Sequence, residues 1–196
     1  MKNITRDKLI RAGAKAMLAK SYNAVGIQEV LSEVNVPKGS FYYYFNSKED
    51  FGKEIIHYYG EQLAKSIQKS LSDTNVSPRE RMVNYFSSLK SYFVNVGCNQ
   101  GCLVAKLATE IADSSPSMRI ALKQEFDKWA ALFADCIREA QKTGEIAKEH
   151  DPESLAEFIY TSWEGALIRM QVNLDPSSID NFMTYIFDRV IPKQTQ

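Results

Sequence analysis

The chain has 196 residues, of which 44% are hydrophobic, and it contains nine glycines and six prolines. A chain of this length buries a substantial core without disulfides, and so few turn-forming residues disfavour an all-β fold. Its first residues, MKNITRDKLIRAG, lack the apolar segment of a secretion signal, and no stretch approaches about eighteen uninterrupted apolar residues. We therefore expect a cytoplasmic protein without membrane association, whose three cysteines are reduced thiols.

The net charge of zero conceals an uneven distribution. Residues 1–48 contain eight Lys/Arg and three Asp/Glu, a net charge of +5, whereas residues 49–196 contain sixteen and twenty-one, a net charge of −5. A basic segment joined to an acidic remainder suits a DNA-facing domain attached to a separate partner domain. Scattered lysines are more often simply solvated, so the charge distribution indicates DNA binding only when a DNA-binding motif accompanies it.

Residues 5–21 form the first predicted helix, with Thr5 as its N-cap. Apolar and small residues recur along it at helical spacing, and lysine and arginine occupy the opposite face. Residues 26–34 form a second, short amphipathic helix, because their aliphatic residues also fall at helical spacing.

A tight corner is predicted at Asn35, a residue that tolerates the left-handed backbone conformation. Pro37 then begins a third helix, where its missing N–H does no harm, and this helix extends over Lys38–Tyr44. Two short helices joined by such a turn form a helix-turn-helix, whose second helix lies in the major groove of DNA.

The third helix carries three consecutive tyrosines, Tyr42, Tyr43 and Tyr44, beside the apolar pair Phe41 and Phe45. At most one of the tyrosines faces a core, because successive residues of a helix point in different directions. We expect the others to present their hydroxyls to solvent or to phosphate oxygens. The alternative interpretation is that they are surface aromatics covering a small helical subdomain.

Six further helices are predicted. Ser47 is expected to cap the next one, with Glu49 and Asp50 complementing the helix dipole, and Gly144 ends the longest. The predicted ranges are 47–71, 78–96, 102–113, 116–142, 152–172 and 178–190. With no convincing strand, the fold class is all-α: about nine helices, arranged as a three-helix head and a helical body.

The segment PKGSFYYYFNSKEDF resembles the signature of the TetR family of transcriptional regulators, which runs roughly small-Lys-Gly-Ser/Thr-aliphatic-Tyr-x-x-Phe-x-x-Lys-Glu. The matching residues are Gly39, Ser40, Tyr42, Phe45, Lys48 and Glu49. The resemblance implies a DNA-binding domain over residues 4–64 and an effector-binding and dimerisation domain over residues 65–196. It also implies a homodimer on a palindromic operator in double-stranded DNA, released by a small-molecule or electrophile effector.

The DNA-binding residues are assigned within the helix-turn-helix. Lys38 is expected to contact guanine O6 and N7, because an extended ammonium at the helix start reaches a base edge. Gln28 is expected to contact a base or a phosphate. Gly39 belongs to the signature, and the remaining residues resemble the family's phosphate contacts: Ser40, Tyr42, Tyr43, Lys48 and, joining them, Tyr44.

The last two predicted helices are apolar on more than one side. In the resembling family these helices pair with their copies in a symmetric four-helix interface. Gly165 and Ala166 are small enough to allow a close crossing. A thick monomer core is the alternative interpretation.

Cys98 and Cys102 flank a short loop, CNQGC, and Cys102 is expected in the first turn of a helix. The helix dipole lowers the pKa of a thiol there, and Lys106 adds a cation on the same face, which favours a reactive thiolate. The GCL segment resembles that of the N-ethylmaleimide-responsive repressors, which sense electrophiles through this cysteine. Where that repressor has a lysine partner for the cysteine, this sequence has Gln171, which leaves Cys98 as an alternative partner.

The alternative interpretation of Cys102 is that it packs as a small buried hydrophobic side chain, and Cys136 is predicted to be a core residue.

The sequence leaves three functions open: a repressor, an activator on the same fold, and a thiol enzyme acting on electrophiles. We expect no enzyme, because no catalytic constellation, phosphate loop or metal-ligand spacing is present, and we expect no cofactor or metal. His57 and His150 are predicted to be solvated. Six aromatic residues are predicted to line either a pocket or the core: Tyr92, Phe93, Trp129, Phe133, Tyr160 and Trp163.

Overall fold

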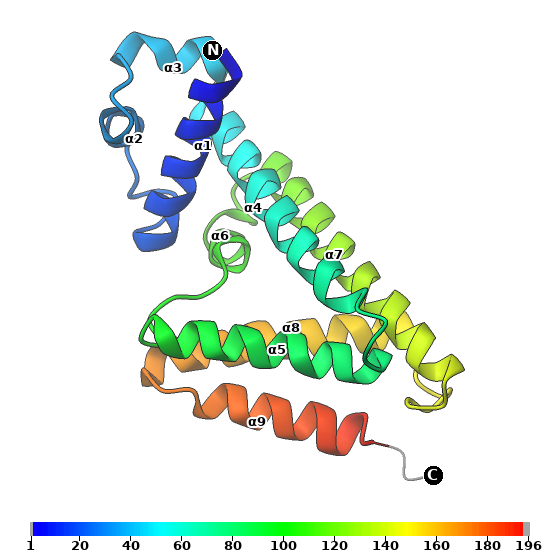
Figure 1. Cartoon of the computed structure of the whole chain (residues 1–196). Coiled ribbons are helices and arrows are strands. Elements are labelled where there is room, and N and C mark those ends of the chain that lie inside the picture. Colours follow the sequence, from blue (N-terminus) through cyan, green and yellow to red (C-terminus); the bar gives the residue numbers. More distant parts are fainter. Residues whose placement is uncertain (1, 194–196) are drawn as a thin grey trace. The chain divides into compact units, whose positions relative to one another are not determined.

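The computed structural model describes residues 2–193, and these form nine α-helices and no strand (Figure 1). The all-α prediction is therefore confirmed. The helices are α1 (Lys2–Ala19), α2 (Ile27–Glu33), α3 (Phe41–Tyr44), α4 (Lys48–Leu71), α5 (Pro78–Asn95), α6 (Leu103–Ile111), α7 (Pro116–Lys142), α8 (Pro152–Asn173) and α9 (Ser177–Tyr185). A 3₁₀ turn, η1 (Lys38–Ser40), precedes α3, and a π turn, η2 (Ile186–Val190), follows α9.

Polar residues begin several helices as predicted. The Ser47 hydroxyl accepts the N–H of Asp50 at 3.0 Å, ahead of α4. The Asp151 carboxylate accepts the N–H of Ser154 at 2.9 Å at the start of α8, and this bond lowers the pKa of Asp151. These side chains satisfy N–H groups that have no partner within their own helix.

The predicted start of the first helix and the predicted end of the last one are wrong. Thr5 is not an N-cap, because α1 already begins at Lys2, and no glycine or proline interrupts the residues before it. The last helix is not regular to residue 190, because the N–H of Ile191 bonds to the carbonyl of Ile186 at 2.8 Å and widens the final turn. Arg79 donates to the carbonyls of Phe187 and Ile191, so the terminal carbonyls are satisfied by a side chain.

The chain divides into two compact units. The first comprises Met1–Gln62 and Cys102–Glu125, and the second comprises Leu63–Gly101 and Phe126–Gln196. Packing thus groups α6 and the first part of α7 with the N-terminal helices. The functional division after residue 64 stays a prediction, and residues 194–196 of its second part lie outside the described residues.

The core of the first unit is built on three phenylalanines. Phe41, Phe45 and Phe51 are at most 2% exposed, and their ring centroids lie 4.7–5.5 Å apart. Gly13 of α1 lies directly against this cluster, since a Cβ built on it would be 2.4 Å from Cζ of Phe51. The glycine therefore sets how closely α1 approaches α4.

An aromatic cluster centred on Phe86 forms the core of the second unit. The ring of Phe86 stacks on Phe133 at 5.4 Å, and the rings of Trp163 and Phe182 both lie 5.0 Å from it. Of the six aromatic residues considered from the sequence, five are buried and Tyr92 is 51% exposed. The aromatic stripe is thus mainly core.

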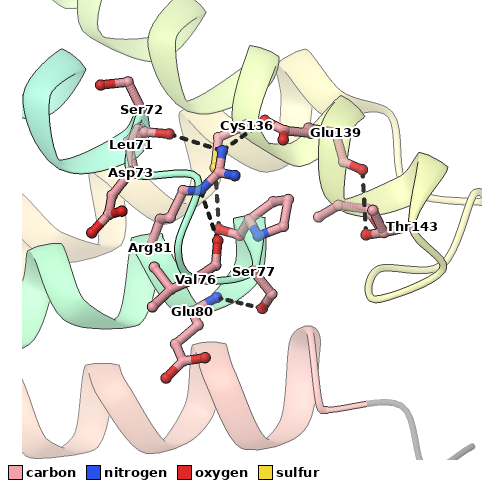
Figure 2. Close-up of polar contacts among 12 residues, drawn as sticks. Leu71, Ser72, Asp73, Val76, Ser77, Glu80, Arg81, Cys136, Glu139 and Thr143 are labelled. Carbon is pink, nitrogen blue, oxygen red and sulfur yellow. Dashed lines mark hydrogen bonds and ion pairs between the residues drawn. The ribbon is translucent and has the colours of Figure 1, made fainter.

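A buried arginine ties the α4–α5 connection to α7 (Figure 2). Arg81 donates from Nε to the carbonyl of Val76 at 3.1 Å, and from Nη1 to the carbonyl of Leu71 at 3.1 Å and to Oε2 of Glu139 at 2.8 Å. Its side chain is only 6% exposed. An open cleft of about 340 Å³ adjoins it. Cys136 also borders this cleft, and its burial raises the pKa of its thiol to about 12, in keeping with the predicted core role.

Candidate nucleic-acid interface

The turn of the helix-turn-helix is a Schellman motif. Asn35 has a φ of 55°, the left-handed conformation that the sequence predicted. The N–H of Val36 bonds to the carbonyl of Leu31 at 2.9 Å, and the N–H of Asn35 bonds to Ser32 at 3.2 Å. Pro37 precedes the 3₁₀ turn, rather than beginning the helix, and its carbonyl accepts the N–H of Ser40 at 2.9 Å.

The tyrosine helix presents two of its three rings outward. Tyr42 is 70% exposed and Tyr43 is 62% exposed, while Phe41 below them is fully buried. Tyr44 is half-buried, and its ring packs edge-on against Tyr43 with the centroids 5.0 Å apart. The prediction that at most one tyrosine faces inward is confirmed.

The other predicted contact residues of this motif lie at its surface. Lys38 and Gly39 are exposed, and Ser40 is half-buried. A Cβ built on Gly39 would have no atom within 4 Å, so its open surface admits a closely approaching backbone. Gln28 is exposed on α2, with its amide 3.5 Å from the hydroxyl of Ser32.

Lys48 is held against the turn between α1 and α2. Its Nζ lies 3.4 Å from the carbonyl oxygen of Asn23 and 4.8 Å from the centre of the Tyr22 ring. Partial burial lowers the pKa of Lys48, and the nearby charge of Glu110 opposes that shift. The ammonium is therefore both oriented and close to the surface.

Both cysteines of the predicted sensor are buried, whereas Lys106 is half-buried. Cys98 and Cys102 are 4% and 7% exposed, and Cys98 has a φ of 57°, which is unusual for a residue with a Cβ. Cys102 is the N-cap of α6, directly before the first turn in which the sequence predicted it. Lys106 donates to the carbonyl of Leu18 at 2.7 Å, so its ammonium has a defined partner on α1.

Gln171 lies beside the predicted sensor loop. Its Oε1 is 2.6 Å from the position that a Cβ on Gly101 would occupy. A side chain at residue 101 would therefore displace the end of the Gln171 side chain from its place beside the loop backbone.

Sequence reasoning missed three acidic side chains that link distant segments within the first unit. Glu110 accepts two backbone N–H groups of the α1–α2 turn, and Glu49 accepts the hydroxyls of Ser115 and Ser117 at 2.5 Å each. His57 is not simply solvated as predicted, because its Nδ1 lies 2.8 Å from Oε1 of Glu125. These partners are 66 or more residues apart in the chain, so no local pattern reveals them.

Within residues 2–193, no cluster of three or more His, Cys, Asp or Glu residues is arranged to hold a metal ion. Within the same range, no helix is both long and apolar enough to cross a membrane.

Comparison with known proteins matches both parts of the chain. Residues 9–55 match the model for bacterial regulatory proteins of the tetR family, and residues 78–186 match the model for the Tetracyclin repressor-like C-terminal domain. The HTH-type transcriptional repressor DhaR of Mycobacterium sp. (strain GP1) is 33% identical over 95% of this chain and 92% of its own length. The HTH-type transcriptional repressor NemR of Escherichia coli (strain K12) is 26% identical over 93% and 92%.

A solved structure agrees with these matches. The regulatory protein TetR from Rhodobacter sphaeroides is 35% identical, with a TM-score of 0.86 over 95% of this chain and 98% of that one. Because the C-terminal match spans more than half of the residues and the helix-turn-helix displays its tyrosines outward, the chain belongs to the TetR family of DNA-binding transcriptional regulators.

Proposed function

We propose that this regulator is a repressor that binds a palindromic operator as a homodimer and is released by a reactive electrophile. The observation that carries the proposal is the exposure of Tyr42 and Tyr43 above the buried Phe41, beside the exposed Lys38. The names of DhaR and NemR favour repression over activation.

In the proposed complex the exposed residues divide into two roles. Lys38 reads a guanine edge, and Gln28 assists at the same groove. Phosphate contacts come from the remaining predicted residues: Gly39, Ser40, Tyr42, Tyr43, Tyr44 and Lys48. Affinity then falls steeply with salt, because each neutralised phosphate releases counterions.

The test uses duplexes enriched from a random library by the wild-type protein. Binding should be tight and should weaken with a steep slope against salt concentration. Lys38→Ala should relax base preference at one position in each half-site, whereas Tyr42→Phe should weaken all sequences alike. Weak binding to every duplex, without a palindromic consensus, would contradict the proposal.

The homodimer is proposed from an apolar face of α8. Phe158, Ile168 and Val172 are 53%, 53% and 70% exposed, and their spacing places them on one side of the helix with Gly165. A Cβ on Gly165 would meet no atom within 4 Å, so this chain leaves the space beside it open. A second copy related by a twofold axis covers such a face.

Introduction of a charge into this apolar face tests the interface. Ile168→Glu should shift the protein from dimer to monomer in sedimentation and should weaken operator binding. Ile120→Glu is the matched control, because Ile120 is 58% exposed on α7 of the first unit. Equal effects of the two substitutions would argue against an α8 interface.

The electrophile response is proposed for Cys102, with Cys98 as its alternative partner and Lys106 as a neighbouring cation. Support comes from the position of Cys102 at the start of α6 and from the similarity to NemR. Treatment with N-ethylmaleimide or a quinone should release the wild-type protein from DNA. Cys102→Ser should abolish release, and Cys136→Ser should not, because the Cys136 thiol has a pKa of about 12. Full release of the Cys102→Ser variant would refute the sensor.

A further inference from the structure

The carboxylate of Glu110, which lies outside the helix-turn-helix, binds the turn that leads into this motif. Glu110 lies near the end of α6, and its Oε2 accepts the N–H of Tyr22 at 2.8 Å while its Oε1 accepts the N–H of Asn23 at 2.8 Å. Two successive amides bound by one carboxylate form a charge-assisted pair of hydrogen bonds. The turn between α1 and α2 is thereby fixed from a segment more than 80 residues away.

The same turn supports Lys48. The carbonyl of Asn23 lies 3.4 Å from its Nζ, and the Tyr22 ring lies beneath the ammonium at 4.8 Å. Both groups that orient Lys48 therefore belong to the two residues whose amides Glu110 binds. Burial lowers the pKa of Lys48, and the charge of Glu110 opposes that shift and so favours the cationic form.

Other bonds keep α6 in place without Glu110. Lys106 binds the carbonyl of Leu18, and Glu49 binds Ser115 and Ser117 just beyond the end of α6. Loss of the Glu110 carboxylate therefore releases the turn locally and leaves the helix attached.

We propose that Glu110 is a positioning residue for DNA binding, which sets the α1–α2 turn and, through Tyr22 and Asn23, the placement of Lys48 on a phosphate. The inference rests on the proposed phosphate contact of Lys48. It assigns to a residue of α6 a direct part in the geometry of the DNA-binding surface.

The direction in which DNA affinity changes when Glu110 is removed distinguishes a positioning role from a purely electrostatic one. A carboxylate near the DNA-facing surface repels phosphates, so its removal would tighten binding if Glu110 acted only as a charge. Positioning predicts the opposite, because a released turn leaves Lys48 mobile.

The experiment measures affinity for a duplex selected by the wild-type protein, over a series of salt concentrations, for Glu110→Ala, Glu110→Gln, Lys48→Ala and the double variant. We expect Glu110→Ala to weaken binding about fivefold to tenfold per head. Its salt slope should fall by about one per head, as for Lys48→Ala. The losses should be less than additive in the double variant, because both substitutions remove the same contact.

Glu110→Gln is the isosteric variant. Its amide keeps one acceptor oxygen but turns an NH₂ group toward the second N–H, so it should show an intermediate loss. This variant decides the question if Glu110→Ala does not fold. Glu149→Ala is the charge control, because Glu149 is exposed between α7 and α8 and should leave both affinity and slope unchanged.

Unchanged or tighter binding by Glu110→Ala and Glu110→Gln, with an unchanged salt slope, would overturn the inference and leave the proposed function intact. Strictly additive losses with Lys48→Ala would also overturn it, because they would separate the two residues. Failure of the wild-type protein to bind any duplex would refute the proposed function and this inference together.

Discussion

Substitution of Gly13 by alanine should destabilise the first unit, although alanine favours a helix. A Cβ at residue 13 would lie 2.4 Å from Cζ of Phe51 and 2.6 Å from Cδ1 of Ile55, both on α4 and both at most 1% exposed. Carbon atoms are most stable about 3.5–4.0 Å apart, so a buried ring must move by about 1 Å. Overpacking of this kind costs about 1–3 kcal/mol, whereas the helix preference of alanine returns about 1 kcal/mol.

Because two buried side chains must both move, the upper part of that range applies, about 2–3 kcal/mol. The expected net loss from Gly13→Ala is then about 1–2 kcal/mol, which lowers the Tm by about 2–8 °C for a chain of this size. Thermal unfolding followed by circular dichroism measures it. Phe51→Leu removes the ring atoms that the new methyl group meets, so Gly13→Ala should cost less in that background. An unchanged or higher Tm for Gly13→Ala alone would refute the argument that this glycine sets the distance between α1 and α4.

Three further predictions follow from the structure. Arg81→Ala should lower the free energy of unfolding in urea by about 3 kcal/mol, because it leaves buried carbonyls without donors; a loss below about 1 kcal/mol would contradict this. Gly39→Ala should leave the Tm unchanged but weaken operator binding at least about fivefold, because the added methyl group meets no protein atom and obstructs only an approaching DNA backbone; unaltered affinity would argue against close approach there. The hydroxyls of Ser115 and Ser117 lower the pKa of Glu49 below 4.5, so its contribution to stability is complete above about pH 4.5 and is lost as the pH falls through the lowered value. Replacement of both serines by alanine should make the acid-side fall of the urea midpoint shallower, and an identical pH profile would contradict the assignment.

The secondary structure was accessible from local chemistry. The start of α4 follows from Ser47, the limits of α7 follow from Pro116 and Gly144, and the corner at Asn35 follows from tolerance of positive φ. The exposure of Tyr42 and Tyr43 was also predictable, because consecutive helical residues cannot all face one core. The errors at Thr5 and beyond Tyr185 occurred where helix ends depend on the absence of a stop signal or on a distant partner such as Arg79.

The sequence by itself determined the class of fold, the helix-turn-helix and the family signature, because each depends on residues within one or two helical turns of each other. Only the tertiary structure decided that Glu110 holds the turn before α2, that Glu125 pairs with His57, and that α6 packs with the N-terminal helices. These contacts join segments separated by long stretches of chain, and a carboxylate that will accept such a bond looks in sequence like any solvated acidic residue. The physical reason is that helix periodicity specifies which face of a helix is buried, whereas the partner of that face is selected by the packing of the whole unit.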